Sequence, residues 1–285
     1  MQAVQGTALI EYDQTTIICL HSSASSAQQW RNLSQEWSEF NVLAPNLVGY
    51  GGQFWRTGDV HTMADEVHAI GEVMSSCPGP VHLIGHSFGG AVATLVALEN
   101  PQQVRSLTLF EPVLFPLLYA TAEGSGQEIW VLQTDVRRHV QLGNNRAAAE
   151  RFVDYWSGEG AFQNLSEHAR QYVIAMTPKV AAEFAALISN PISEADLRSL
   201  RVPTLLLYGE DSPDSTRDIT RLLARILPCR ELLEFDGLGH MGPMEDPDRV
   251  NATIAAFVGR HNVPDFCFST EQPAKLKINT SGGVT

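Results

Sequence analysis

Residues 81–90 read VHLIGHSFGG and carry the strongest structural signal in the sequence. An apolar run over 81–85 leads directly into Gly85-His86-Ser87-Phe88-Gly89, which fits the pattern G-x-S-x-G, and a helical pattern follows over 88–98. A serine between a strand and a helix lies on a sharp turn where only small neighbours fit. The start of the helix also directs free N–H groups and the positive end of its dipole toward the hydroxyl. The pattern predicts that Ser87 is a nucleophile.

Short apolar runs alternate with amphipathic stretches on both sides of this turn. We expect strands at 16–20, 42–45, 81–85, 104–110, 204–208 and 231–235, and helices at 27–37, 63–74, 88–98, 217–226 and 248–258. Strands that are apolar on both faces and separated by helices indicate βαβ units and a parallel sheet. The predicted fold class is therefore α/β, with a mostly parallel central sheet flanked by helices.

The middle of the chain lacks this alternation. Residues 114–196 contain helical patterns rich in Ala, Glu and Arg and no run typical of a strand. We therefore predict an α/β core made of residues 1–113 and 197–260, a helical insertion over 114–196, and a C-terminal tail over 261–285.

Composition excludes several classes of partner. The 285 residues include 19 Lys and Arg against 32 Asp and Glu, a net charge of −13. Such a chain repels nucleic-acid phosphates and anionic membrane surfaces. The four cysteines are scattered, and the first residues lack the pattern of a secretory signal. No uninterrupted apolar run approaches the roughly 18 residues of a membrane span. We expect a cytoplasmic protein that binds a small molecule, with no nucleic acid or membrane as partner.

A serine nucleophile needs a base, and His240 is the best candidate. It lies in residues 237–243, GLGHMGP, a loop between the last expected strand and the last expected helix. Glycines on both sides allow the imidazole to reach the serine. His82 and His86 adjoin the serine turn, but we expect packing or backbone contacts for them.

These segments together resemble the α/β-hydrolase superfamily, in its branch with a serine nucleophile and a helical cap. The resemblance rests on GHSFGG at 85–90, GLGH at 237–240 and the early strand that ends in Leu20-His21, and it runs from about residue 16 to 259. It implies that the inserted helices cap the serine. It also implies an oxyanion hole formed by the N–H groups of Ser23 and Phe88, although Ser22 stands where the family usually has glycine. Residues 46–52, NLVGYGG, resemble a structural turn of the family.

The third catalytic residue has two candidates. Most members carry an Asp three residues after the glycine that ends the next-to-last strand, but here Gly209 is followed at that position by Ser212, and Asp211 is one place early. Some members, the haloalkane dehalogenases among them, place the acid after an earlier strand, where this chain has Glu111. We favour Glu111 and keep Asp211 as the alternative. Either carboxylate would hold the imidazole tautomer and stabilise the imidazolium.

The resemblance implies a hydrolase, and three functions remain open. Related dehalogenases and epoxide hydrolases use Asp at the position of Ser87, whereas a serine suits acyl transfer. We favour a serine hydrolase that cleaves a small, mainly hydrophobic carboxylic ester or lactone through an acyl-serine intermediate. The alternatives are a carbon–carbon bond hydrolase of the meta-cleavage type and a small-molecule receptor with slow hydrolysis.

The substrate-binding residues that we expect are Phe115, Leu118 and Met241, which would line an apolar pocket. A carbon–carbon hydrolase usually needs a cap arginine, for which the chain offers Arg137, Arg138, Arg146, Arg151 and Arg170. We expect no metal, because no His, Asp and Glu cluster has ligand spacing. We expect no other cofactor either, because GHSFGG lacks the order of a dinucleotide fingerprint.

Overall fold

The computed structural model describes residues 14–52, 60–120 and 124–262. Its centre is a six-stranded sheet in which every pair of neighbours is parallel, with the order β2-β1-β3-β4-β5-β6. The strands are β1 (Thr16–Leu20), β2 (Asn41–Leu43), β3 (Val81–His86), β4 (Val104–Phe110), β5 (Thr204–Gly209) and β6 (Arg230–Phe235). All six expected strands are present, which confirms the predicted α/β class.

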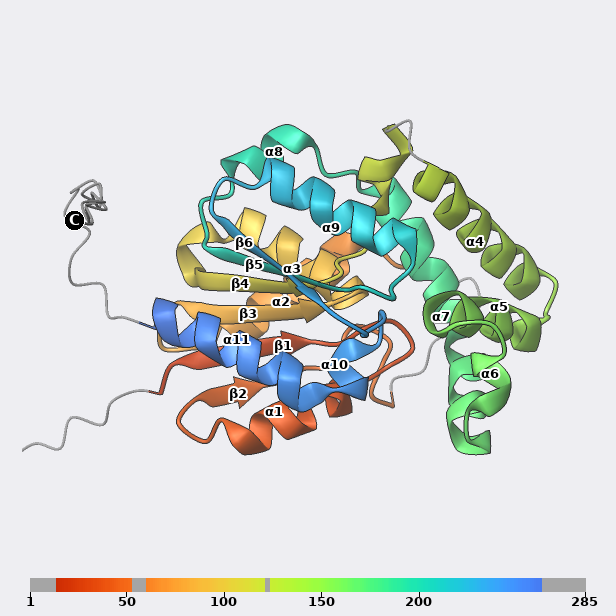
Figure 1. Cartoon of the computed structure of the whole chain (residues 1–285), viewed down its shortest axis with the longest axis horizontal. Coiled ribbons are helices and arrows are strands. Elements are labelled where there is room, and N and C mark those ends of the chain that lie inside the picture. Colours follow the sequence, from red (N-terminus) through yellow and green to blue (C-terminus); the bar gives the residue numbers. More distant parts are fainter. Residues whose placement is uncertain (1–13, 53–59, 121–123, 263–285) are drawn as a thin grey trace, which may run out of the picture.

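Helices cover both faces of the sheet (Figure 1). One face packs against α2 (Met63–Ser75), α3 (Phe88–Glu99) and α9 (Asp214–Ile226), and the other against α1 (Arg31–Glu36) and α11 (Pro247–His261). Successive residues of β1 therefore enter opposite cores, Ile18 with α2 and α3, and Ile17 with α1 and α11. Because side chains alternate along a strand, burial on both faces requires a continuous apolar run.

A helical insertion separates β4 from β5. It consists of η3 (Phe115–Ala120), α4 (Gly124–Gln141), α5 (Asn145–Ser157), α6 (Ala161–Asn164) and α7 (Glu167–Ser189), after which α8 (Glu194–Ser199) leads back to the sheet. Figure 1 shows α4 to α7 gathered at one end of the sheet. Helix α7 contacts α2 and η3, and α4 contacts α9, so the insertion packs directly against the core.

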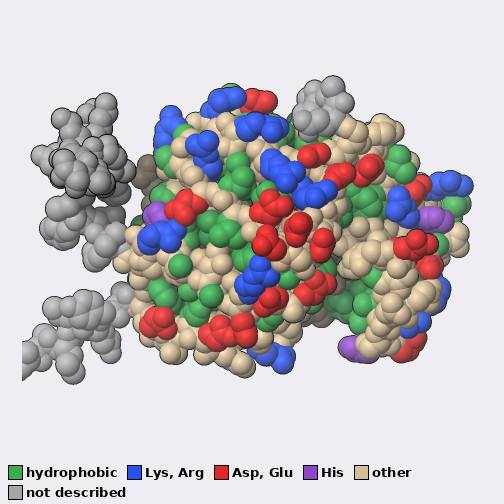
Figure 2. All heavy atoms as spheres, viewed as in Figure 1, with side chains coloured by type: hydrophobic (Ala, Val, Ile, Leu, Met, Phe, Trp, Pro, Cys, Tyr) green, Lys and Arg blue, Asp and Glu red, His purple; other side chains and the backbone are tan. Residues whose placement is uncertain are grey.

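Helix α7 is the one helix in the described part of the chain that is long and apolar enough to cross a membrane by length and composition. Half of its most apolar window is buried inside the protein. The core helix of a soluble protein passes the same test, so this feature is weak evidence for a membrane span. The face of the molecule drawn in Figure 2 shows acidic and basic side chains intermixed.

Helix boundaries differ from the expected ones by a few residues. Helix α9 begins at Asp214, three residues before the expected start, and α11 begins at Pro247 and continues to His261. The Asp246 carboxylate accepts a hydrogen bond from the Arg249 N–H and so caps α11. Most of the expected tail, residues 263–285, lies outside the described residues.

Candidate active site

Ser87 occupies a strained turn between β3 and α3. Its φ is 56° and its ψ is −118°, a conformation that non-glycine residues rarely adopt. A side chain on Gly85 would collide with the Gly89 carbonyl, and one on Gly89 would lie 2.5 Å from the Leu20 and His21 carbonyl oxygens. The glycines of the motif are therefore required by the close approach of α3 to β1 and β3.

Three side chains from separate loops form one hydrogen-bonded series. His240 Nε2 lies 3.0 Å from Ser87 Oγ, and His240 Nδ1 lies 2.6 Å from Glu111 Oε2. An ionised carboxylate only accepts hydrogen bonds, so Nδ1 carries the proton and Nε2 is left to accept from the serine hydroxyl. All three side chains are buried. The geometry suits removal of the serine proton by the imidazole.

Glu111 is held in place by its second carboxylate oxygen. Oε1 accepts hydrogen bonds from the Gly209 N–H at 2.8 Å and from the Ser212 hydroxyl. The backbone at Glu111 has a φ of 46°, and its N–H bonds the Leu207 carbonyl at 2.9 Å. Ser212 stands where most of the superfamily has its acid, and here it donates to the acid from β4.

Asp211, the alternative acid, is not brought to the imidazole. Its side chain is exposed, and its N–H bonds the Leu238 carbonyl at 2.9 Å. The Nδ1 atom of His240 faces Glu111 instead. A one-residue offset on this turn is enough to direct the Asp211 carboxylate into solvent.

The two expected oxyanion donors lie beside the serine. Ser23 and Phe88 line the same cavity as Ser87. Phe88 is the first residue of α3, where the N–H has no acceptor within the helix. His21 holds the loop before Ser23, since its Nδ1 bonds the Ser22 carbonyl at 2.8 Å and its Nε2 accepts from the Leu47 N–H at 3.1 Å.

Ser22 stands where the family usually has glycine. A series of hydrogen bonds runs from Ser22 to the loop that carries His240. Its N–H and its hydroxyl donate to Gln29 Oε1 at 3.0 and 3.2 Å. Gln29 Nε2 donates to His86 Nδ1 at 3.0 Å, and His86 Nε2 donates to the His240 carbonyl at 2.9 Å. Burial lowers the pKa of His86 well below its ordinary value, so the ring stays neutral and keeps this donor pattern.

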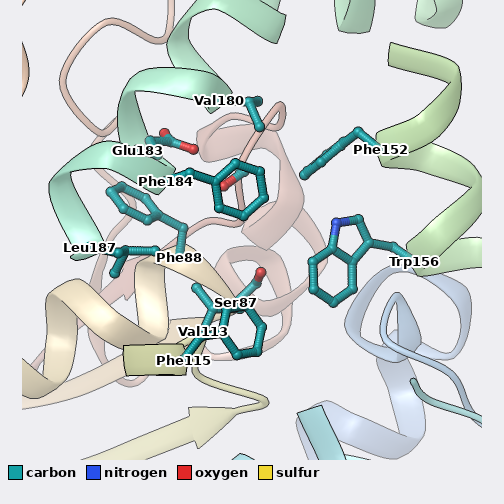
Figure 3. Close-up of a pocket in the computed structure, with 11 residues that line it drawn as sticks. Ser87, Phe88, Val113, Phe115, Phe152, Trp156, Val180, Glu183, Phe184 and Leu187 are labelled. Atoms are coloured by element: carbon teal, nitrogen blue, oxygen red, sulfur yellow. The ribbon is translucent and has the colours of Figure 1, made fainter. Parts of the chain in front are cut away.

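A cavity of about 270 Å³ of empty space opens above Ser87 (Figure 3). Its lining is mostly apolar and comes from both the core and the insertion: Ser23, Ser87, Phe88, Val113, Phe115, Phe152, Trp156, Val180, Glu183, Phe184 and Leu187. Of the three expected substrate contacts only Phe115 is among them. Leu118 is buried in the larger hydrophobic core, and Met241 precedes the short helix α10 (Gly242–Glu245) without lining the cavity. Helical spacing could not show which apolar residues face the cavity.

Trp156 of α5 stacks on the imidazole of His240. The two ring centroids are 4.4 Å apart and the ring planes differ by 29°. Phe115 in turn stacks on Trp156, with centroids 6.1 Å apart. An aromatic face stabilises an adjacent cation, so this contact favours a positive charge on the imidazole. Sequence patterns missed it, because α5 and the His240 loop are far apart along the chain.

A buried ionic cluster lies beside the cavity, and sequence reasoning missed it as well. Lys179 Nζ on α7 lies 3.2 Å from Glu183 Oε1, 3.4 Å from Glu66 Oε1 and 3.0 Å from His61 Nε2, and all four side chains are buried. Burial raises the pKa of Glu66 to about 7 and lowers that of His61 to about 4. The i,i+4 spacing of Lys179 and Glu183 is also common on exposed helix faces, so spacing alone does not reveal a buried pair.

Comparison with known proteins finds hydrolases among the similar chains. A lipase, LipV, from Mycobacterium tuberculosis (strain ATCC 25618 / H37Rv) is 26% identical over 260 residues, which cover 85% of this chain and 93% of the lipase. A 2-hydroxymuconate semialdehyde hydrolase from Pseudomonas putida is 25% identical over 229 residues, 76% of each chain. The structure of a thermophilic esterase from Thermogutta terrifontis superposes with a TM-score of 0.70 at 25% identity, covering 87% of this chain and 91% of the esterase. The model of the alpha/beta hydrolase family matches residues 17–253, and this chain therefore belongs to that family.

Proposed function

We propose that the protein is a serine hydrolase that cleaves a small, mainly hydrophobic carboxylic ester or lactone through an acyl-serine intermediate. The observation that carries this proposal is the series Ser87–His240–Glu111, with distances of 3.0 and 2.6 Å between the bonded atoms. It supplies a nucleophile, a base and a group that orients the base.

In the first half-reaction, Ser87 Oγ attacks the ester carbonyl carbon while His240 Nε2 takes the serine proton. The carbonyl oxygen becomes an oxyanion, and the N–H groups of Ser23 and Phe88 are the donors proposed to bind it. The imidazolium, stabilised by Glu111 and by the face of Trp156, then gives its proton to the leaving alkoxide. The C–O bond breaks, and the acyl group stays on Ser87.

In the second half-reaction, water attacks the acyl carbon. His240 accepts a proton from the water and later returns it to Ser87 Oγ as the acyl–serine bond breaks. The carboxylic acid leaves, and the enzyme returns to its starting state.

The lining of the cavity supports a mainly hydrophobic substrate. Aromatic and aliphatic side chains dominate it. An apolar lining with few polar groups favours small hydrophobic acyl groups over peptides or sugars.

Carbon–carbon hydrolysis of the meta-cleavage type receives less support. None of the five candidate arginines of the insertion is among the residues that line the described cavity. Arg151 pairs with Asp135 at 3.3 Å, Arg170 bonds the Leu165 carbonyl at 2.8 Å, and Arg146 lies over the Phe162 ring. A substrate carboxylate would therefore meet no arginine beside Ser87.

The test is hydrolysis of p-nitrophenyl acetate, butyrate and octanoate by the wild type and by Ser87→Ala. We expect multiple turnovers in the range of roughly 1–10³ per second with the two short esters. Octanoate should be slower, and the variant should be inactive toward all three. Equal release by wild type and variant would overturn the proposal. A single slow turnover per protein molecule would favour a receptor.

A further inference from the structure

The wall of the cavity contains a buried carboxylate oxygen that makes no hydrogen bond with the residues that the structure describes. Glu183 Oε1 accepts from Lys179 Nζ at 3.2 Å, but Oε2 has no partner among the described residues. The Glu183 side chain is only 2% exposed and lines the cavity above Ser87. An unpaired buried acceptor destabilises the folded state because it has lost its hydrogen bonds to water, and a charged acceptor does so more strongly.

Polar side chains surround the Glu183 carboxylate, but none in the described part of the chain meets Oε2 with the geometry of a hydrogen bond. Tyr50 lies beside the Glu183 carboxylate, whose charge and side-chain hydrogen bonding help to raise the Tyr50 pKa, and the Tyr50 hydroxyl accepts from the Ala24 N–H at 3.0 Å. Lys179 is turned toward Glu183 Oε1, Glu66 and His61. Figure 3 shows Glu183 with Val180 and Phe184 on the far side of the cavity from Ser87.

The same cavity contains an unpaired donor. The indole Nε1 of Trp156 is buried without a hydrogen-bond partner in the described part of the chain. Trp156 and Glu183 both line the cavity, and apart from Ser23 and Ser87 the other lining side chains are apolar. Besides Ser23 and Ser87, a ligand in this cavity therefore meets the Glu183 acceptor and the Trp156 donor.

We propose that Glu183 selects substrates that carry a hydroxyl group, which donates to Glu183 Oε2 across the cavity from Ser87. A hydroxyl both donates and accepts, so it matches the two kinds of unpaired atom, whereas an ammonium group only donates. A site built to bond a hydroxyl rejects the analogue that lacks it, because the buried polar group is then left unpaired. This inference rests on the proposed ester hydrolysis and names its substrate class as hydroxylated esters or lactones.

The experiment compares substrates that differ in one group. On the acyl side the pair is p-nitrophenyl 3-hydroxybutanoate and p-nitrophenyl 3-methylbutanoate, and on the alcohol side it is 2-hydroxyethyl butanoate and n-propyl butanoate. Within each pair a hydroxyl replaces a methyl group at constant heavy-atom count. We expect the wild type to favour the hydroxylated member of at least one pair by about 10-fold to 100-fold in kcat/KM, as for a hydrogen bond to a charged group.

Variants at position 183 test whether the preference for the hydroxylated substrate depends on the Glu183 carboxylate. Glu183→Leu should abolish the preference, and Glu183→Gln should keep part of it, because the amide oxygen is an uncharged acceptor. Glu167→Gln, an exposed position on the same helix, is the matched control and should keep the wild-type ratio. The ratio within a pair is the readout, so a general loss of activity in Glu183→Leu does not hide the effect.

Three results would overturn the inference. One is a wild type that treats both members of both pairs alike, which needs no variant to fold. Another is a hydroxyl preference that survives in Glu183→Leu. The third is equal or better hydrolysis of the 3-amino analogue of the acyl pair, which would replace the hydroxyl by an ammonium. If no ester of either pair is hydrolysed in a Ser87-dependent way, the proposed function itself fails.

Discussion

Glu111 is bound to two donors on one carboxylate oxygen and to His240 on the other, while Asp211 points into solvent. We therefore expect Glu111→Gln to lower kcat on the order of 10³-fold to 10⁴-fold, because an amide favours the wrong imidazole tautomer. Asp211→Asn is the matched control and should keep wild-type kcat. Steady-state kinetics with p-nitrophenyl butyrate measures both. Equal losses in the two variants would contradict the assignment of the acid.

Trp156 differs from the other aromatic residues of the cavity in its stacking on the imidazole. Trp156→Leu should lower kcat by about 3-fold to 30-fold, because a cation–π contact is worth roughly 0.5–2 kcal/mol. Trp156→Phe should recover most of that loss. Phe152 lines the same cavity without stacking on His240, so Phe152→Leu should act mainly on KM. A kcat unchanged in Trp156→Leu would show that the stacking has no role in the chemistry.

At the scale of elements, the packing of α3 against β1 depends on Gly89. A Cβ there would lie 2.5 Å from the carbonyl oxygens of Leu20 and His21, which are backbone atoms that cannot swing away. Gly89→Ala should cost about 1–3 kcal/mol of unfolding free energy and displace the loop that carries Ser23. Gly71 on α2 has open space around its Cβ position, so Gly71→Ala should gain about 0.5–1 kcal/mol. Urea denaturation of both variants checks the contrast, and a stable, fully active Gly89→Ala would refute it.

The elements that the sequence predicted well are those with a strong local pattern. The apolar runs of β1, β3 and β4 and the G-x-S-x-G turn identified the parallel sheet and the place of Ser87. His240 could be anticipated from its glycine-flanked loop. Each of these features depends on residues that are neighbours in the chain.

What could not be predicted depends on contacts between distant segments. The choice between Glu111 and Asp211 depends on how two loops at the ends of β4 and β5 face His240. The cavity lining depends on which face of α5 and α7 turns inward, so Leu118 was expected there and Glu183 was not. The pairing of Glu66 with Lys179 joins two residues 113 positions apart.

At the scale of the whole molecule, buried histidines make the fold sensitive to acid. Burial lowers the pKa of His21, His61 and His82 from 6.5 to about 4. The unfolded chain then binds more protons than the folded one between these values, so stability falls as the pH drops below 6.5. Glu66 acts in the opposite direction. Its pKa is about 7 in the folded chain against 4.5 in the unfolded one, so proton binding by Glu66 stabilises the fold at low pH. That stabilisation is lost as the pH rises from 4.5 to 7.

The three histidines change the free energy of unfolding more than the single Glu66 carboxyl group does. The folded protein should therefore lose stability as the pH falls. We expect the Tm to fall by roughly 10 °C between pH 7 and pH 5. Thermal unfolding followed by circular dichroism measures this, and His82→Asn, on β3, should make the slope shallower. A Tm that rises or stays constant over this interval would contradict the assignment of neutral buried imidazoles.

Whether Ser87 is an activated nucleophile can be measured by mass spectrometry of the intact and digested protein after exposure to a fluorophosphonate probe. An activated serine forms a covalent adduct with such a probe, whereas ordinary serines do not. We expect one adduct on the peptide that contains Ser87, no adduct in Ser87→Ala, and much slower labelling in His240→Asn. Ester hydrolysis by a protein that remains unlabelled at Ser87, or that is labelled at another residue, would contradict it.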